Sequence, residues 1–243
     1  GSRSLQLGGS AIAEACERIR ERLFHTAAQV LEAAPEDLEL RDGMVGPRGA
    51  PHRSVPLQEV IRHHLEVHPE SSLSETTRFT GAETVPFGTT IALVSIDPET
   101  GRVTIERYVS VDDVGRVINP TLVEGQLVGG AAQGIGEALF ERLVYDESGQ
   151  LLNGSLLDYA VPRAQRLPRF EFERTETPTP HNPLGAKGVG EAGTVHAPVA
   201  VANAVVDALR HVGVSAVELP LTDEKVWRLL HRAAGSSLDG GAG

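Results

Sequence analysis

The segment that most constrains the fold is residues 121–141, TLVEGQLVGGAAQGIGEALFE, which is apolar and unusually rich in glycine and alanine. A surface helix covers a core with large side chains, and this segment has few of them. Glycine and alanine instead allow two backbones to approach closely. The sequence therefore predicts a helix at 121–141 that packs directly against the backbone of another element.

Helical periodicity appears in four other places. Residues 10–34 and 56–67 carry apolar residues at spacings of three and four, with charged residues between them, which predicts amphipathic helices. We expect further helices at 199–213 and 223–233. On the helix at 199–213, Val199, Ala202, Val206 and Leu209 are expected on one face.

Strand-like patterns alternate irregularly with these helices. Residues 89–96 and 102–111 predict a β-hairpin. On its second strand, Val103, Ile105, Val109 and Val111 are expected on one face. Further predictions are a short strand at 38–45, a second hairpin at 143–152, a half-exposed strand at 169–174 and a strand at 215–221. This order predicts an α+β fold with mixed helices and largely antiparallel strands. We expect one region at 1–234 and a disordered tail at 235–243.

The net charge narrows the range of partners. Thirty-three acidic residues against 22 basic ones give a formal charge of −11, which disfavours binding to nucleic acid or to an anionic membrane. No run of about 20 apolar residues predicts a membrane span, and no signal peptide is recognised, so a cytoplasmic location is expected. The chain starts at Gly1 without methionine, and we expect it to be part of a longer protein.

Cysteine and histidine give no prediction of a metal site. Cys16 is the only cysteine, which excludes an internal disulfide and a thiolate-bound iron–sulfur cluster formed by this chain alone. Its helical spacing from Ile12 and Leu23 predicts a buried structural thiol. Although His64 and His68 are four residues apart, Pro69 ends their helix and no third ligand has a fixed spacing to them. We therefore expect the histidines at the surface and no metal bound by side chains.

The stretch LGAKGVGEAGT, residues 184–194, contains the glycine pattern G-x-G-x-x-G. A dinucleotide-binding loop needs a strand directly before its first glycine. Here the nearest predicted strand ends at Arg174, and the prolines that follow prevent its extension. Glu218 could still bind a ribose, which keeps a nucleotide-binding module at Gly188–Gly193 as an alternative.

Glu191 is the one carboxylate among these small residues. It is either an exposed residue at the start of the next helix, where the helix dipole favours it, or a general base whose pKa rises in an apolar pocket. The residues alone favour neither interpretation.

Several motifs together resemble one family in the expected order, from Gly1 to about residue 233. The chain is similar to the C-terminal part of the large subunit of the molybdenum hydroxylases, the xanthine dehydrogenase and aldehyde oxidase family. The details most resemble the aerobic carbon monoxide dehydrogenase branch. The motifs are GSRSLQLGGSA, DDVGRVINP, VEGQLVGGAAQGIGEAL, NGSLLDYAVPRA, NPLGAKGVGEAGT and APVAVANAVVDAL.

This resemblance implies a second molybdenum-cofactor-binding domain and a set of site residues. Glu191 would be the catalytic base. Asp113 and Asn119 would lie near the cofactor, although a turn in which they cap local backbone explains them equally well. Gln126 and Gln133 would give structural support. The residues implied to contact the cofactor are Gly1, Ser2, Arg3, Ser4, Lys187, Gly188, Val189 and Gly190.

The resemblance also implies partners and a reaction. The cofactor would be molybdenum–molybdopterin in its cytosine dinucleotide form. An FAD-binding medium subunit, an iron–sulfur small subunit and the N-terminal part of the large subunit would complete the enzyme, so the chain alone would be inactive. The reaction would be oxidative hydroxylation of an aldehyde, an N-heterocycle or carbon monoxide, with water as the oxygen source. A scaffold that binds no cofactor is a further alternative.

Overall fold

The computed structural model describes residues 2–235, which form two compact units. Of the described residues, the larger unit takes 2–3, 83–181 and 185–235, and the smaller unit takes 4–82 and 182–184. From residue 236 on, the predicted disordered tail lies outside the described residues. Gly235, its first residue, is the last residue of helix α5.

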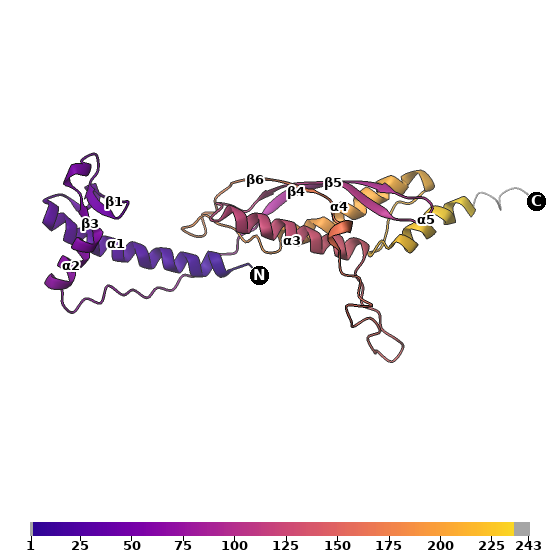
Figure 1. Cartoon of the computed structure of the whole chain (residues 1–243), viewed down its shortest axis with the longest axis horizontal. Helices are drawn as coiled ribbons and strands as arrows, with labels where there is room; N and C mark the ends of the chain where they lie inside the picture. The colour runs from indigo at the N-terminus through magenta and orange to yellow at the C-terminus, as the bar shows by residue number, and fades with distance from the viewer. Residues whose placement is uncertain (1, 236–243) are drawn as a thin grey trace, which may run out of the picture. The chain divides into compact units, whose positions relative to one another are not determined.

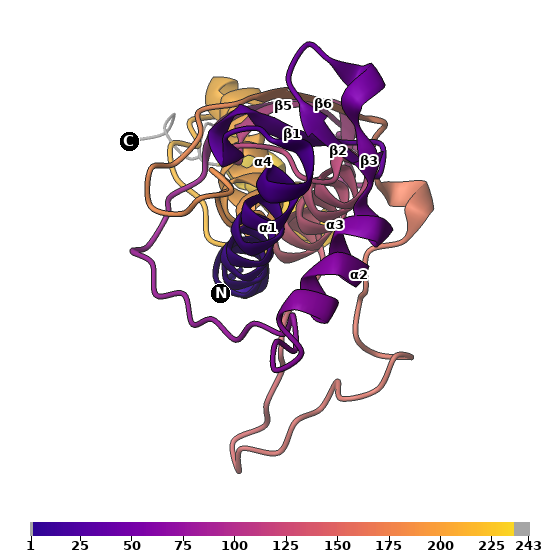
Figure 2. The same cartoon turned by 90° about the vertical axis from the view of Figure 1, so that its left-hand side faces the viewer.

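The smaller unit combines two helices with a small antiparallel sheet (Figure 2). Helix α1 (Ser10–Leu31) and helix α2 (Leu57–Val67) agree with the predicted amphipathic helices, and a π-helical turn, η1 (Ser4–Gly9), precedes α1. The remaining elements are η2 (Pro35–Asp37), β1 (Leu38–Arg41), β2 (Met44–Pro47), η3 (Pro51–Arg53) and β3 (Val55–Pro56), with sheet order β1-β2-β3.

The prediction of a single strand at 38–45 was wrong, because the chain reverses inside it. Asp42 and Gly43 have φ angles of 50° and 78° and form a two-residue turn between β1 and β2. An Asp-Gly pair favours such hairpin turns, since both positions need positive φ.

Only the C-terminal part of α1 lies in a core. Leu23 and Ala27 pack against Leu38 and Val60, the latter on α2. Cys16 is exposed, so the prediction of a buried thiol was wrong. The sheet and α2 meet α1 near its C-terminal end, where the buried residues cluster, and the apolar stripe continues beyond that contact.

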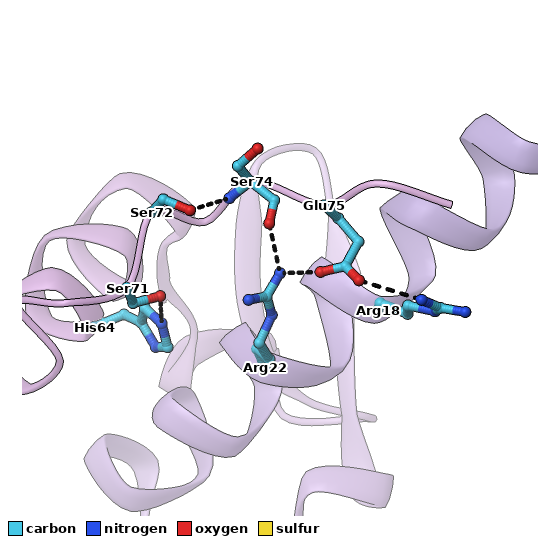
Figure 3. Close-up of polar contacts among 7 residues, drawn as sticks. All are labelled: Arg18, Arg22, His64, Ser71, Ser72, Ser74 and Glu75. Carbon is cyan, nitrogen blue, oxygen red and sulfur yellow. Dashed lines mark hydrogen bonds and ion pairs between the residues drawn. The ribbon is translucent and has the colours of Figure 1, made fainter. Parts of the chain in front are cut away.

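The chain after α2 is tied to both helices by polar side chains (Figure 3). Glu75 accepts hydrogen bonds from Arg22 at 2.7 Å and from Arg18 at 3.3 Å. His64 is 5% exposed, so its prediction as a surface residue was wrong. Its ring nitrogens contact the hydroxyls of Thr26 at 2.7 Å and Ser71 at 3.1 Å, and burial lowers its pKa.

The larger unit is built on the predicted hairpin. Strands β4 (Phe87–Ile96) and β5 (Val103–Asp113) pair antiparallel, and β6 (Phe170–Thr175) pairs parallel to β5, in the order β4-β5-β6. The predicted hairpin at 143–152 is reduced to one antiparallel bridge between Tyr145 and Leu151. The α+β class with mixed helices and sheets is confirmed.

A β-bulge changes which residues of β5 are buried. Leu93 pairs with Arg107 and Val94 pairs with Ile105, which leaves Glu106 as the extra residue. The prediction that Val109 and Val111 share a face with Val103 and Ile105 was therefore wrong, because the bulge puts them on the opposite face. After the bulge Tyr108, Ser110 and Asp112 are fully buried on the side of Ile105, and Asp113 at the end of the strand is buried as well.

Helices α3 (Pro120–Leu139) and α4 (Ala192–Leu209) cover one face of this sheet, and α3 runs beneath it in Figure 1. The predicted close backbone contact of residues 121–141 is confirmed. A Cβ on Gly130 would lie 2.9 Å from the backbone nitrogen of Thr194, and one on Gly134 would lie 2.8 Å from the Cβ of Ala197. Three further helical segments are η4 (Ala164–Arg166), η5 (Arg210–Val212) and α5 (Asp223–Gly235).

Two elements near the C-terminus differ from the predictions. Leu209, one of the four residues predicted to share a face of α4, is fully buried, but it is buried together with Val201 and Val205, whereas Val199 is 58% exposed. Residues 215–221 form no strand; Pro220 has no N–H to donate, and Leu221 instead donates to the carbonyl of Ala138 at 2.7 Å.

One stretch of the described chain, Ala192–Val212, is long and apolar enough to meet the length and composition of a membrane span. Its Val201, Val205 and Leu209 side chains are fully buried within the larger unit. This segment is therefore placed as a core helix of the larger unit.

Candidate functional site

The loop before α4 is held against the end of β5 by backbone hydrogen bonds. Arg116 donates to the Gly185 carbonyl at 2.9 Å and Lys187 donates to the Val114 carbonyl at 2.8 Å. Gly115 and Gly185 have φ angles of 69° and 68°. A Cβ on Gly115 would lie 2.4 Å from the Gly185 carbonyl oxygen, so only glycine permits this approach.

Lys187 and Asp113 form a buried ion pair beneath this loop. The ammonium group lies 2.8 Å from Asp113 Oδ1, and the two side chains are 8% and 1% exposed. The ammonium group also lies 4.3 Å from the centre of the Phe87 ring. The structure thus brings together two residues that the resemblance placed at the cofactor, and joins them to each other.

The Asp113 carboxylate is saturated with hydrogen bonds. Besides Lys187, it accepts from the backbone N–H of Gly115 at 3.0 Å and from the Thr175 hydroxyl at 3.1 Å. Burial alone would raise the pKa of Asp113, but hydrogen bonds from Lys187, Thr177, Gly115 and Thr175 together hold it well below its ordinary value. Asp113 is therefore an ionised anchor for the loop.

The glycine loop itself meets the N-terminal residues and the segment before β4. Gly190 donates its N–H to the Ser2 hydroxyl at 2.6 Å, and Gly188 donates to the Thr84 hydroxyl at 3.4 Å. Arg3 pairs with Glu83 at 2.8 Å. The structure therefore places Ser2 against the glycine loop and Arg3 against the segment before β4, while their contact with a cofactor stays a prediction.

Other predicted site residues lie elsewhere. Ser4 begins the turn η1 in the smaller unit, and Gly1 lies outside the described residues. Asn119 is the N-cap of α3, where its side-chain oxygen accepts from Leu122 N–H at 3.1 Å. This geometry agrees with the interpretation that Asn119 caps local backbone.

Glu191 is the N-cap residue of α4, and its side chain is exposed. Its carbonyl accepts from the N–H groups of Thr194 and Val195, both at 3.1 Å. Thr194 in turn donates its hydroxyl to the Gly130 carbonyl of α3 at 3.1 Å and contacts Gln133 at 3.4 Å. The backbone of Glu191 is thus fixed, while its carboxylate faces outward.

A ring of four polar side chains, Thr90, Ser110, Asp112 and His196, was missed by the sequence reasoning. His196 on α4 contacts Thr90 of β4 at 2.8 Å and the carboxylate of Asp112 on β5 at 3.1 Å. Ser110 closes the ring, with contacts to Thr90 at 2.9 Å and Asp112 at 2.7 Å. Because Asp112 is only 1% exposed, this ring is an internal fastening between α4 and both strands.

The donor set suits an anionic cofactor more than a bare metal ion. In the part of the chain that the structure describes, no three His, Cys, Asp or Glu side chains are grouped to hold a metal. The first turn of α4 instead follows a loop of Gly, Val and Gly, where backbone N–H groups and the helix dipole favour phosphate groups. Before Gly188 there is an isolated bridge at Ala186 and no strand, unlike a dinucleotide-binding loop.

Known proteins resemble this chain in sequence and in fold. The family model of the molybdopterin cofactor-binding domain matches residues 1–168. The nicotine 6-hydroxylase large subunit of Paenarthrobacter nicotinovorans is 41% identical over 94% of this chain and 29% of that protein. The carbon monoxide dehydrogenase large chain of Hydrogenophaga pseudoflava is 35% identical over 95% of this chain and 29% of that protein.

Solved structures agree with these relatives. Quinoline 2-oxidoreductase from Pseudomonas putida 86 superposes with a TM-score of 0.84 at 34% identity, covering 95% of this chain and 30% of that one. Reconstituted carbon monoxide dehydrogenase from Oligotropha carboxidovorans gives 0.87 at 30% identity, covering 97% and 30%. The chain spans less than a third of the length of these relatives. It belongs to the family of molybdopterin cofactor-binding domains found in the large subunits of molybdenum hydroxylases.

Proposed function

We propose that the chain provides the catalytic base and part of the cofactor site of a molybdenum hydroxylase. The observation that carries this proposal is the placement of Glu191: an exposed carboxylate on a fixed backbone, directly after a glycine loop and at the N-terminus of a buried helix. When bound, the molybdenum cofactor would supply the two-electron oxidation chemistry of the reaction.

The chain's own residues would position and move a proton. A carboxylate oxygen of Glu191 would accept a proton from the water-derived nucleophile. The first turn of α4 would direct its helix dipole toward the anionic part of the cofactor, while the Thr84 and Ser2 hydroxyls hold the N–H groups of Gly188 and Gly190 and so fix the loop. Lys187 would act indirectly, since its ammonium group is paired with Asp113 and so holds the loop in place.

The expected cofactor form and partners follow from the family. We propose the cytosine dinucleotide form of molybdopterin, with FAD and iron–sulfur clusters on partner subunits in a cytoplasmic complex. Among substrate classes, an N-heterocycle is favoured over carbon monoxide, because the identity to a nicotine hydroxylase is 41% against 35% to a carbon monoxide dehydrogenase. Turnover of nicotine, quinoline and carbon monoxide by the purified complex would separate these classes.

Glu191→Gln in the complete enzyme tests the assigned role. We expect molybdenum and pterin contents to stay near those of the wild type while kcat falls by about 10²–10⁴-fold, as for loss of a general base. Glu137→Gln, an exposed carboxylate on α3, is the matched control and should leave kcat unchanged. Near-normal kcat in Glu191→Gln would exclude Glu191 as the base. Loss of molybdenum together with activity would make it an anchor, and a wild-type complex without molybdenum would favour the scaffold alternative.

A further inference from the structure

Strand β4 is an edge strand that lacks the usual protection. Within residues 2–235 it pairs with β5 on one side and with no strand on the other. Its ten residues, FGTTIALVSI, contain no charged residue and no proline. Native proteins normally protect such an edge with charge, proline, a bulge or short length, because its free N–H and C=O groups can pair with another strand. The extra residue of the bulge lies on β5, so β4 itself stays regular.

The outward face of β4 is also apolar. Phe87, Ile91 and Leu93 are 57%, 66% and 57% exposed. In the register of the sheet, Val109 lies opposite Ile91 and Val111 lies opposite Thr89, which extends the apolar strip onto β5. An antiparallel sheet with one solvated face carries polar residues there, so this strip is suited to being covered.

The edge of β4 begins at the candidate site and is held rigid there. Thr84, just before β4, accepts the hydrogen bond from Gly188, and the Phe87 ring lies against the Lys187 ammonium group. Further along, Thr90 is fastened to His196 on α4. A strand added to β4 would therefore lie beside the loop that carries Glu191.

We propose that β4 receives a strand from the part of the large subunit that corresponds to the rest of the relatives' length. The incoming strand would be extended, with apolar side chains on the face shared with Ile91 and Leu93. This occupant is chosen because the chain matches only 29% of the length of its large-subunit relatives and because the edge starts at the site. The inference rests on the proposed function, because the added strand has to come from the rest of a molybdenum hydroxylase large subunit.

Hydrogen exchange tests the pairing directly. In the complete large subunit, alternate backbone amides of β4 should be strongly protected, whereas in the 243-residue chain alone the same amides should exchange fast. Ile91→Lys should weaken association of the chain with the remaining large-subunit polypeptide by about tenfold or more. Val199→Lys, at a similarly exposed apolar residue on α4 (58% against 66%), is the control and should have little effect.

The outcomes separate this inference from the proposed function. Unprotected β4 amides in a molybdenum-containing subunit would overturn the strand addition and leave the function standing. Protected β4 amides without molybdenum would support the strand addition and count against the function. Protection already present in the chain alone, with the mass of a dimer, would assign the edge to a second copy and overturn the proposal.

Discussion

Asp113→Asn removes one charge from the buried pair while nearly keeping its shape. The Lys187 ammonium group then loses its carboxylate at 2.8 Å while its side chain is only 8% exposed. At an effective dielectric constant of about 20, that attraction is about 6 kcal/mol before desolvation of the two ions is subtracted. Since breaking a buried ion pair costs about 3–5 kcal/mol, we expect a loss of that size in the free energy of unfolding of the larger unit.

Lys187→Met should cost less than Asp113→Asn. The methionine keeps the apolar stem, and the Asp113 carboxylate keeps its bonds from Gly115 and Thr175. In the double variant neither charge is left unpaired, so its loss should be smaller than the sum of the two single losses by at least about 1.5 kcal/mol.

Scanning calorimetry is the suitable assay, because two compact units need not unfold in one transition. A loss of 3–5 kcal/mol corresponds to a shift of about 6–20 °C in the transition of the larger unit, at about 2–4 °C per kcal/mol. Glu171→Gln breaks the exposed pair with Arg107 in the same sheet and should leave that transition in place. Strictly additive losses in the double variant would refute the argument that Asp113 and Lys187 stabilise each other.

Two further predictions concern acid and helix packing. The folded pKa of Asp113 lies below its unfolded value of about 3.9, so its contribution to the free energy of unfolding is complete above that pH and is lost as the pH falls through the folded pKa. Urea unfolding at pH 7 and at pH 3 should therefore show a smaller loss of stability on acidification in Asp113→Asn than in the wild type. An equal loss in the two proteins would contradict this. Gly130→Ala should destabilise by about 1–3 kcal/mol, since its Cβ would lie 2.9 Å from the backbone of Thr194. Gly129→Ala, with nothing within 4 Å, should stabilise by up to about 1 kcal/mol in the same unfolding assay; similar effects of the two would argue against close packing of α3 on α4.

Local patterns were sufficient for most of the fold. The amphipathic spacing of α1 and α2, the β4–β5 hairpin and the glycine-rich α3 were all predictable, because each depends on neighbours a few residues away. The errors arose where tertiary contacts decide. Cys16 continues the apolar stripe of α1 beyond the part that the small sheet and α2 cover. Which residues of β5 are buried depends on a bulge that no residue pattern marks.

The candidate site was predictable as a set of segments but not as a set of contacts. Lys187 and Asp113 are 74 residues apart, and nothing in their spacing indicates that they bind each other. His196 and Asp112 are 84 residues apart, and their contact depends on where the bulge turns β5. Glu191 was open to two interpretations, and the exposed N-cap position in this chain agrees with the first, while its role as a base stays a prediction.

The extra residue in β5 lets one strand perform two tasks. Before Glu106 the buried side chains are aliphatic and belong to the core with α4; after it they are Tyr108, Ser110 and Asp112, which point to the same interior from a shifted register. Because Glu106 has no partner on β4, deleting it would remove the bulge and leave Tyr108, Ser110 and Asp112 facing the same interior. A deletion in the regular part after the bulge, at Val109, would instead turn Ser110 and Asp112 away from His196 while Val103 and Ile105 stay in the core, so the site could be lost from an otherwise intact scaffold.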